Sequence, residues 1–260
     1  MAQRPVGAAL VFGAALLACA PAGAMTLHEV ELTCPYDGTK FKFMEQGSGT
    51  SFDKSLGLMA YGPIQSPWPI AVCPTNGFVF LKDQYDDADL ARLKPIVLSA
   101  EYQATRDETP YYRAAWITEH DGGDHAKVSW LLLQATWEAG TADVRERYAA
   151  RLKGAPDLEK KVVMAEGTTS ERYKRYAAEL LARLPADIAA NPDKPDTYKI
   201  LTGELLRRLG RFEEADVFLG DYAVKLDPAG TLAKVVAFER ALIAKRDIGI
   251  HFFSELPGAK

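Results

Sequence analysis

The stretch TYKILTGELLRRLGRFEEADVFLGDYAVKLDP, residues 197–228, indicates two amphipathic helices joined by a tight turn. Apolar residues recur at helical spacing on both sides of Gly210. A glycine just past the end of a helix is common, because it adopts the left-handed conformation without steric cost. We therefore predict that one helix ends at Gly210, that the next begins near Phe212, and that the two form a hairpin.

The hairpin also carries a characteristic series of small and large residues. Its members are Gly203, Leu206, Gly210, Phe212, Ala215, Leu219, Ala223 and Pro228. This series resembles the tetratricopeptide repeat, a helix-turn-helix unit that stacks into a concave superhelix. In that repeat the small residues let two helices approach closely, and the large ones fill the seam between neighbouring units. The resemblance implies an array of helical hairpins that offers a groove to another protein.

The rest of the chain from Asp86 onward is also predicted to be helical, since Ala, Leu, Arg and Glu recur there at helical spacing. Helix starts are predicted at Thr109, Asp124, Thr141 and Ser170, and helix ends at Gly140 and before Pro185. By contrast, residues 26–81 are rich in Gly, Pro, Thr and aromatics, which favours short strands and turns. We predict an α+β, mostly α fold, with a β-rich module at 25–85 and a helical repeat-like domain at 86–260.

A twin cysteine motif lies in the β-rich module. The segments Cys34-Pro-Tyr-Asp37-Gly and Cys73-Pro-Thr-Asn76-Gly share the pattern Cys-Pro-x-Asp/Asn-Gly. They resemble the paired Cys-Pro-x-Cys-Gly knuckles of zinc ribbons, in which four thiolates surround the metal. An uncharacterised family of bacterial proteins joins such knuckles to a tetratricopeptide-like region, and the chain resembles that layout. Asp37 and Asn76 replace the second cysteine of each knuckle.

The resemblance implies that Cys34 and Cys73 face each other. In an oxidising compartment two facing thiols form a structural disulfide, which is the interpretation we favour. Two alternatives stay open. One is a zinc site built from Cys34, Cys73 and Asp37, with His28 as a further ligand, and the other is a pair of free or redox-active thiols. We otherwise expect no cofactor.

The N-terminus has the features of an export signal. Arg4 precedes an apolar stretch at residues 6–18, and the triplet at residues 22–24 is a signal-peptidase site. We therefore predict a signal peptide at 1–24 and a periplasmic or otherwise exported protein, with no transmembrane span after cleavage. Residues 16–19 also resemble a lipoprotein box, so the alternative is a membrane-anchored lipoprotein with its lipid on Cys19.

Charge and motifs limit the function classes. Of 31 basic residues only Arg4 lies in the signal, and all 35 acidic residues remain after cleavage, which argues against a nucleic-acid partner. No nucleophile elbow, phosphate-binding glycine loop or zinc-protease motif is present. Residues 120–125, HDGGDH, hold four possible metal ligands, but we interpret them as a turn between helices.

Aromatic residues cluster at 111–137. Most are expected in the core, whereas Tyr112 and Trp116 could anchor a peptide partner if they faced a groove. We therefore expect a non-catalytic binding or scaffolding protein of the bacterial cell envelope, with a protein partner. The alternatives are metal binding or sensing at the cysteine knuckles, and an envelope enzyme whose site is assembled from distant residues.

Overall fold

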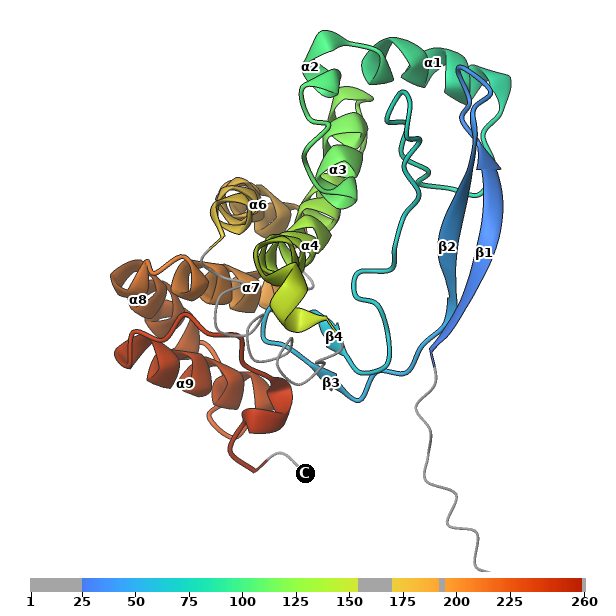
Figure 1. Cartoon of the computed structure of the whole chain (residues 1–260). Coiled ribbons are helices and arrows are strands. Elements are labelled where there is room, and N and C mark those ends of the chain that lie inside the picture. The colour runs from blue at the N-terminus through green and yellow to red at the C-terminus, as the bar shows by residue number, and fades with distance from the viewer. Residues whose placement is uncertain (1–24, 154–169, 192–194, 259–260) are drawn as a thin grey trace, which may run out of the picture.

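The computed structural model describes residues 25–153, 170–191 and 195–258. The predicted signal segment 1–24, including Cys19, lies outside these residues. A small β region precedes a helical array (Figure 1), so the predicted class, α+β and mostly α-helical, is confirmed. Within the described ranges, no helix combines the length and apolar character that crossing a membrane requires.

The β region consists of two small antiparallel sheets. The strands are β1 (Thr26–Thr33), β2 (Lys40–Ser48), β3 (Asp53–Lys54) and β4 (Ala60–Tyr61). β1 and β2 form a ribbon along one side of the molecule (Figure 1). Val30 pairs with Phe43 on its half-buried face. On the other face Glu29 and Lys42 form an exposed ion pair at 2.7 Å. This alternation lets a two-stranded ribbon cover part of the core.

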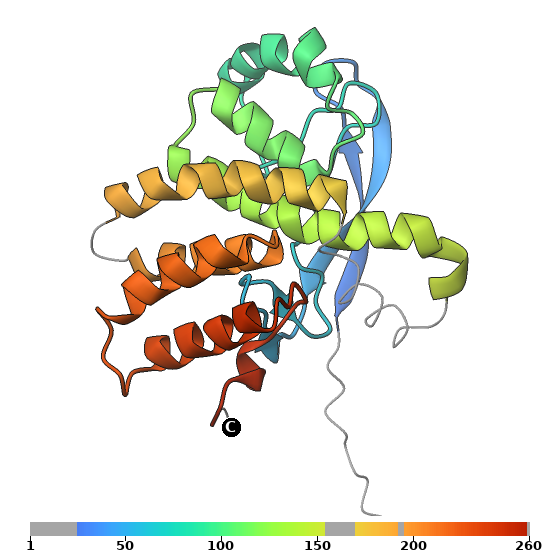
Figure 2. The ribbon, with the colours of Figure 1, turned by 90° about the vertical axis from the view of Figure 1, so that its left-hand side faces the viewer.

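The helices follow one another as a layered array. They are α1 (Asp87–Val97), α2 (Ala100–Gln103), α3 (Pro110–His120), α4 (His125–Leu152), α6 (Glu171–Ala190), α7 (Pro195–Arg208), α8 (Phe212–Ala223), α9 (Thr231–Ala244) and the short 3₁₀ helix η2 (Phe253–Glu255). From α3 to α9 each α-helix packs on the next one in the chain. Figure 2 shows α4 and α6 above the hairpin of α7 and α8, with α9 below. The predicted hairpin is confirmed as α7 and α8, and Gly210 between them has φ +74°.

Local capping signals locate two helix starts correctly. The Asp124 carboxyl accepts a hydrogen bond from the backbone N–H of Lys127 at 3.2 Å, where α4 begins. The Ser170 hydroxyl accepts from the N–H of Tyr173 at 2.9 Å, where α6 begins. Both side chains satisfy an N–H that has no partner within its helix.

The predicted break at Gly140 and Thr141 is wrong, because α4 continues through both residues. The Thr141 hydroxyl bonds to the backbone carbonyl of Trp137 at 3.2 Å, one turn earlier in the same helix, and so does not cap a new one. Gly140 is buried in a helix that packs on both α3 and α6. That packing outweighs the cost of placing glycine inside a helix, which is about 1 kcal/mol relative to alanine.

The predicted end of α6 before Pro185 is also wrong, since the helix runs on to Ala190. Pro185 is exposed, whereas Leu184 and Asp187 on either side of it are buried. A proline inside a helix removes one backbone hydrogen bond and costs about 3 kcal/mol. The contacts of the buried residues offset this cost.

The hydrophobic core forms two clusters that cross the predicted boundary between residues 85 and 86. The larger contains both cysteines and Phe78 together with buried residues of α1, α3, α4 and α6. The smaller combines α7, α8 and α9 with Leu56 of the β region. Each cluster therefore takes residues from both predicted segments.

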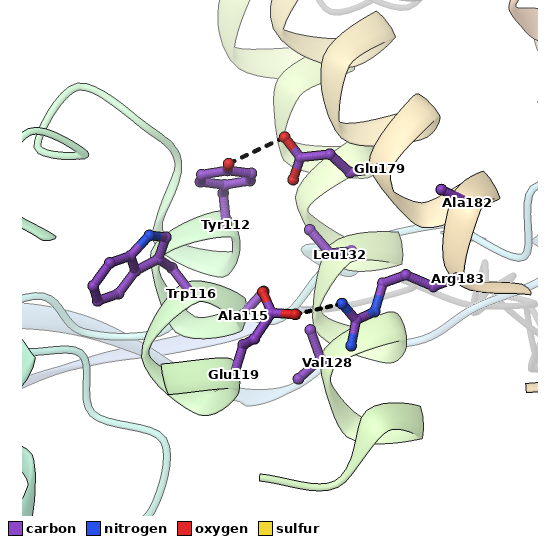
Figure 3. Close-up of a pocket in the computed structure, with 9 residues that line it drawn as sticks. All are labelled: Tyr112, Ala115, Trp116, Glu119, Val128, Leu132, Glu179, Ala182 and Arg183. Carbon is purple, nitrogen blue, oxygen red and sulfur yellow. Dashed lines mark hydrogen bonds and ion pairs between the residues drawn. The ribbon is translucent and has the colours of Figure 1, made fainter. Parts of the chain in front are cut away.

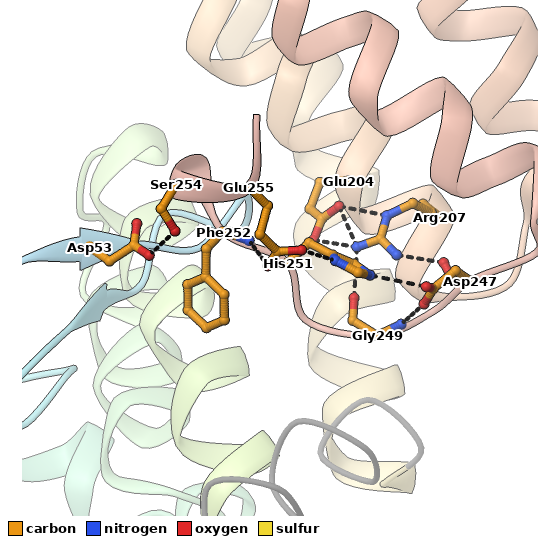
Figure 4. Close-up of polar contacts among 9 residues, drawn as sticks. All are labelled: Asp53, Glu204, Arg207, Asp247, Gly249, His251, Phe252, Ser254 and Glu255. Atoms are coloured by element: carbon orange, nitrogen blue, oxygen red, sulfur yellow. Dashed lines mark hydrogen bonds and ion pairs between the residues drawn. The ribbon is translucent and has the colours of Figure 1, made fainter. Parts of the chain in front are cut away.

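The segment after α9 ties the helical array to strand β3 (Figure 4). The Ser254 hydroxyl donates to the Asp53 carboxylate at 2.5 Å. The His251 ring lies between two carboxylates, 3.0 Å from Asp247 and 2.8 Å from Glu255. The bond between Ser254 and Asp53 thus joins the C-terminal segment to a strand 201 positions earlier in the chain.

Candidate functional site

A pocket of about 290 Å³ lies between α3, α4 and α6 (Figure 3). Its lining consists of Tyr112, Ala115, Trp116, Glu119, Val128, Leu132, Glu179, Ala182 and Arg183. The structure thus brings both predicted partner-binding residues to one pocket. They lie four residues apart on α3, a spacing that places side chains on the same helix face.

The two aromatic residues of the pocket are each held by a second ring. Tyr112 stacks on Tyr176 of α6, with ring centroids 4.3 Å apart and planes at 12°. Trp116 stacks on His120 at 3.5 Å. Both residues are half-buried, so one part of each is packed and another part lines the pocket.

Charged groups surround the apolar floor of the pocket. The Tyr112 hydroxyl donates to Glu179 Oε1 at 3.1 Å, and Arg183 donates to Glu119 Oε1 at 2.6 Å. Burial raises the pKa of Tyr112 to about 12, so the hydroxyl keeps its proton and remains a donor. Burial also raises the pKa of Glu179, against the hydrogen bond from Tyr112 and the nearby charge of Arg175. The pocket therefore contains two carboxylates and one guanidinium.

A further ion pair holds the stacked rings of Tyr112 and Tyr176, which form the aromatic wall of the pocket. Arg175 and the hydroxyl of Tyr176 both donate to the carboxylate of Glu108. The Arg175 guanidinium also lies 5.6 Å from the ring centroid of Tyr112, within the range of a cation–π contact. These interactions connect α6 to the residues preceding α3 and fix the Tyr112 ring.

The start of α3 is capped by a residue from another helix. Thr109 is the N-cap but makes no side-chain capping bond. Instead, the backbone N–H of Tyr111 donates to Glu138 Oε2 of α4 at 2.8 Å. Burial raises the pKa of Glu138 to about 7, against the hydrogen bond from the backbone N–H of Tyr111. An acid from α4 thus orients the helix that carries the pocket aromatics.

We expect Glu138 to make stability fall as the pH rises from about 4.5 to about 7. Below this window the carboxyl is protonated in both states, and above it the carboxyl is ionised in both. Within it the unfolded state loses its proton first, which favours unfolding. The change amounts to about 2 to 3 kcal/mol, allowing for partial exposure.

Urea unfolding of the wild type and of Glu138→Gln at pH 4.5 and pH 8 measures this effect. Glutamine keeps an oxygen for the N–H of Tyr111 but does not titrate. The stability of the variant relative to the wild type should therefore rise between the two pH values. Glu171→Gln, on exposed α6 surface, is the control and should show no such change. A difference that is independent of pH for Glu138→Gln would contradict the assignment.

The two Cys-Pro turns have the same backbone hydrogen bonds. In the first turn the N–H of Cys34 donates to the carbonyl of Thr39 at 2.8 Å, and the N–H of Gly38 donates to the carbonyl of Cys34 at 3.0 Å. The same bonds close residues 73–78 at 2.8 and 2.9 Å. Gly38 and Gly77 occupy the fifth position with φ +71° and +74°. This left-handed conformation is the reason for a glycine in both turns.

The turns face each other, and the cysteines are joined. The Sγ atoms of Cys34 and Cys73 are 2.08 Å apart and their Cα atoms 5.5 Å apart, as in a disulfide. Beside them, Asp37 Oδ2 accepts from Asn76 Nδ2 at 3.1 Å and from the Thr75 hydroxyl at 2.6 Å. The hydrogen bonds from Thr75 and Thr39 lower the pKa of Asp37, so it is a charged acceptor. A disulfide and a polar contact thus occupy the four knuckle positions.

The residues at this place do not fit zinc. The two cysteines and Asp37 offer donor atoms within 4.8 Å of one another, but the sulfurs are bonded together. Asn76 directs an N–H toward Asp37 and not a lone pair toward a metal. His28 lies on β1, where its Nε2 is 3.0 Å from Glu45 and belongs to no common group with the cysteines. Four tetrahedral ligands are therefore not assembled.

The possible ligands at residues 120–125 do not converge either. His120 packs on the Trp116 ring, whereas His125 Nδ1 lies 2.9 Å from Asp187 of α6. Gly122 has φ +70° in the connection between α3 and α4. The interpretation of this segment as an inter-helix turn is confirmed.

Sequence reasoning proposed only Tyr112 and Trp116 of this lining as binding residues. Among the residues it missed are the three from α6, namely Glu179, Ala182 and Arg183. Their spacing shows only that they share a region of one helix. No feature of the sequence indicates that this region lies against Tyr112, 67 positions away. The pairing depends on how α6 packs against α3 and α4.

Comparisons with known proteins return no match, whether to protein-family models, to curated proteins or to solved structures.

Proposed function

We propose that this chain is a non-catalytic binding protein of the bacterial cell envelope, and that a protein partner inserts a side chain into the pocket between α3, α4 and α6. The pocket itself carries the proposal. It combines two aromatic residues held by stacking, an apolar floor and a charged rim. Aromatic residues around a pocket are typical anchors of protein interfaces.

The composition of the lining supports binding over catalysis. Its charged and hydroxyl-bearing members are Tyr112, Glu119, Glu179 and Arg183. They are bonded to one another in two pairs, Tyr112 with Glu179 and Arg183 with Glu119. The hydroxyl of this lining belongs to Tyr112, and burial raises its pKa to about 12, so it keeps its proton and donates to Glu179. The lining has no serine, threonine, cysteine or lysine, the side chains that most often act as nucleophiles in covalent catalysis. Export to the envelope is supported by the signal-like N-terminus and is compatible with the disulfide.

Affinity capture from envelope extract tests the proposal. The chain from Met25 is immobilised, and retained proteins are identified by mass spectrometry. We expect a reproducible partner that is lost with the double variant Tyr112→Ala/Trp116→Ala. A second variant, Ala182→Trp, fills the mouth of the pocket from an exposed position without removing packed rings, and should lose the same partner.

Trp130→Ala is the matched control, because Trp130 is 51% exposed on α4 and does not line the pocket. The partner should remain with this variant. Circular dichroism shows whether each variant is folded. No reproducible partner, or a partner retained by Ala182→Trp, would argue against the pocket as the binding site.

A further inference from the structure

We propose that the pocket receives a cationic side chain, a lysine or arginine of the partner, between the Tyr112 ring and the Glu179 carboxylate. This inference rests on the proposed binding function and specifies the chemistry of the ligand. Four features carry it: an incompletely used carboxylate, the charge balance of the lining, an available aromatic face, and the size of the cavity.

Glu179 supplies the incompletely used carboxylate. Its Oε1 accepts one hydrogen bond from Tyr112, while its other oxygen points into the space between that ring and Arg183 (Figure 3). Arg183 lies four residues later on α6, where it could pair with Glu179, but it donates to Glu119 instead. A half-buried carboxylate with a neutral partner favours a cation beside it.

The charge balance of the lining also favours a cation. Glu119 and Glu179 oppose a single arginine, and the bond between Arg183 and Glu119 neutralises one of the two acids. The remaining acid is the one beside the aromatic wall. The nearby cation Arg175 is already paired with Glu108, so an anionic ligand would be repelled by the Glu179 carboxylate in this partly desolvated site.

The Tyr112 ring provides the third feature. One face is covered by Tyr176, and the other is directed toward the pocket (Figure 3). An ammonium or guanidinium group over a tyrosine face gains cation–π attraction, and most so when water is excluded. Arg175 already lies within cation–π range of this aromatic pair, 5.6 Å from the ring centroid of Tyr112 and 5.3 Å from that of Tyr176.

Size and apolarity complete the fit. A volume of about 290 Å³ is at the small end for ligand pockets and suits one long side chain. Ala115, Val128 and Leu132 form an apolar floor for the methylene stem. Lysine and arginine characteristically bury such stems while the charged head finds polar partners.

Three matched peptides provide the test: acetyl-Gly-Lys-Gly-amide and its norleucine and glutamate analogues. Binding to the ¹⁵N-labelled chain from Met25 is measured by NMR titration at fixed ionic strength. We expect saturable shifts of pocket residues with the lysine peptide only. Glu179→Gln should weaken this binding about tenfold, the effect of losing one partly desolvated charge pair.

Arg183→Gln gives an effect of opposite sign. It removes the competing cation and frees Glu119, so the lysine peptide should bind more tightly. Glu171→Gln, an exposed acid on the same helix, should leave the affinity unchanged. Equal binding of the norleucine peptide, preference for the glutamate peptide, unchanged affinity in Glu179→Gln, or no binding of any peptide would each overturn the inference.

Two results separate this inference from the proposed function. A partner captured from extract that Ala182→Trp loses but Glu179→Gln retains would leave the binding function in place and refute the cationic ligand. Specific binding of the lysine peptide without any captured partner would support the cation site and weaken the proposed role as a protein-binding component.

Discussion

Replacing Arg207 with methionine is expected to lower the free energy of unfolding by about 3 to 5 kcal/mol. Arg207 is fully buried in α7, where its guanidinium donates to both carboxylate oxygens of Glu204 at 2.9 Å. It also donates to the backbone carbonyls of Asp247 and Gly249, beyond α9 (Figure 4). One side chain thus satisfies a buried acid and two carbonyls of the C-terminal segment.

The cost is large because a second acid lies nearby. Glu239 of α9 is fully buried and neither of its carboxylate oxygens has a hydrogen-bond partner. Burial and the charge of Glu204 raise the pKa of Glu239, while Arg207 lowers it. Without the guanidinium, Glu204 would lose its counter-ion and face Glu239 in a site that water does not reach.

Arg211→Met is the matched control for Arg207→Met. Arg211 forms the same kind of arginine–glutamate pair at a spacing of three residues, with Glu214, but both side chains are exposed. Its loss should cost less than about 1 kcal/mol. Urea unfolding of both variants with the disulfide intact gives the comparison, and equal losses would contradict the argument from burial.

A double variant separates the loss of attraction from the burial of an unpaired charge. Arg207→Met/Glu204→Met removes both charges and should be less destabilised than Arg207→Met alone, because no acid is left without its partner in α7. Greater destabilisation of the double variant would indicate that the packing of these side chains matters more than their charge.

The second large effect is expected from the cysteine pair. The double variant Cys34→Ala/Cys73→Ala should lose about 4 kcal/mol of unfolding free energy, since the bond closes a loop across a sequence separation of 39. The disulfide stabilises the folded state by lowering the conformational entropy of the unfolded chain. Both cysteines are 1% exposed and belong to the larger core cluster, so their removal also affects packing.

Urea unfolding with and without reductant measures this contribution. Reduced wild type should approach the double variant, and the variant should not respond to reductant. Asp37→Ala is the control for the polar contact beside the disulfide, and it should destabilise the chain far less than loss of the disulfide because Asp37 is exposed. Thiol titration of the denatured chain from Met25 should find no free thiol before reduction and two afterwards. Two free thiols before reduction would refute the bond.

Both predictions concern connections between distant parts of the chain. The disulfide joins the two turns of the β region at the larger core cluster. Arg207 joins α7 to the segment after α9, and Ser254 of that segment bonds to Asp53 of strand β3. Both support the array in which α3, α4 and α6 form the pocket, so loss of either should be checked for an indirect effect on binding.

The sequence by itself determined the features that depend on a few neighbouring residues. Gly210, Asp124 and Ser170 marked helix boundaries because left-handed backbone and side-chain caps are local requirements. The repeated Cys-Pro turns were visible for the same reason. The change near residue 86 from a composition that favours strands to one that favours helices indicated the class of fold.

Only the tertiary structure decided the features that depend on packing between distant segments. Gly140 and Pro185 lie inside helices because buried contacts outweigh their local preferences. Likewise, Glu138, Glu179 and Arg207 owe their roles to segments of the chain that lie beside them in space. Burial and charge pairing are set by neighbours in three dimensions, and a single sequence does not specify which segments become those neighbours.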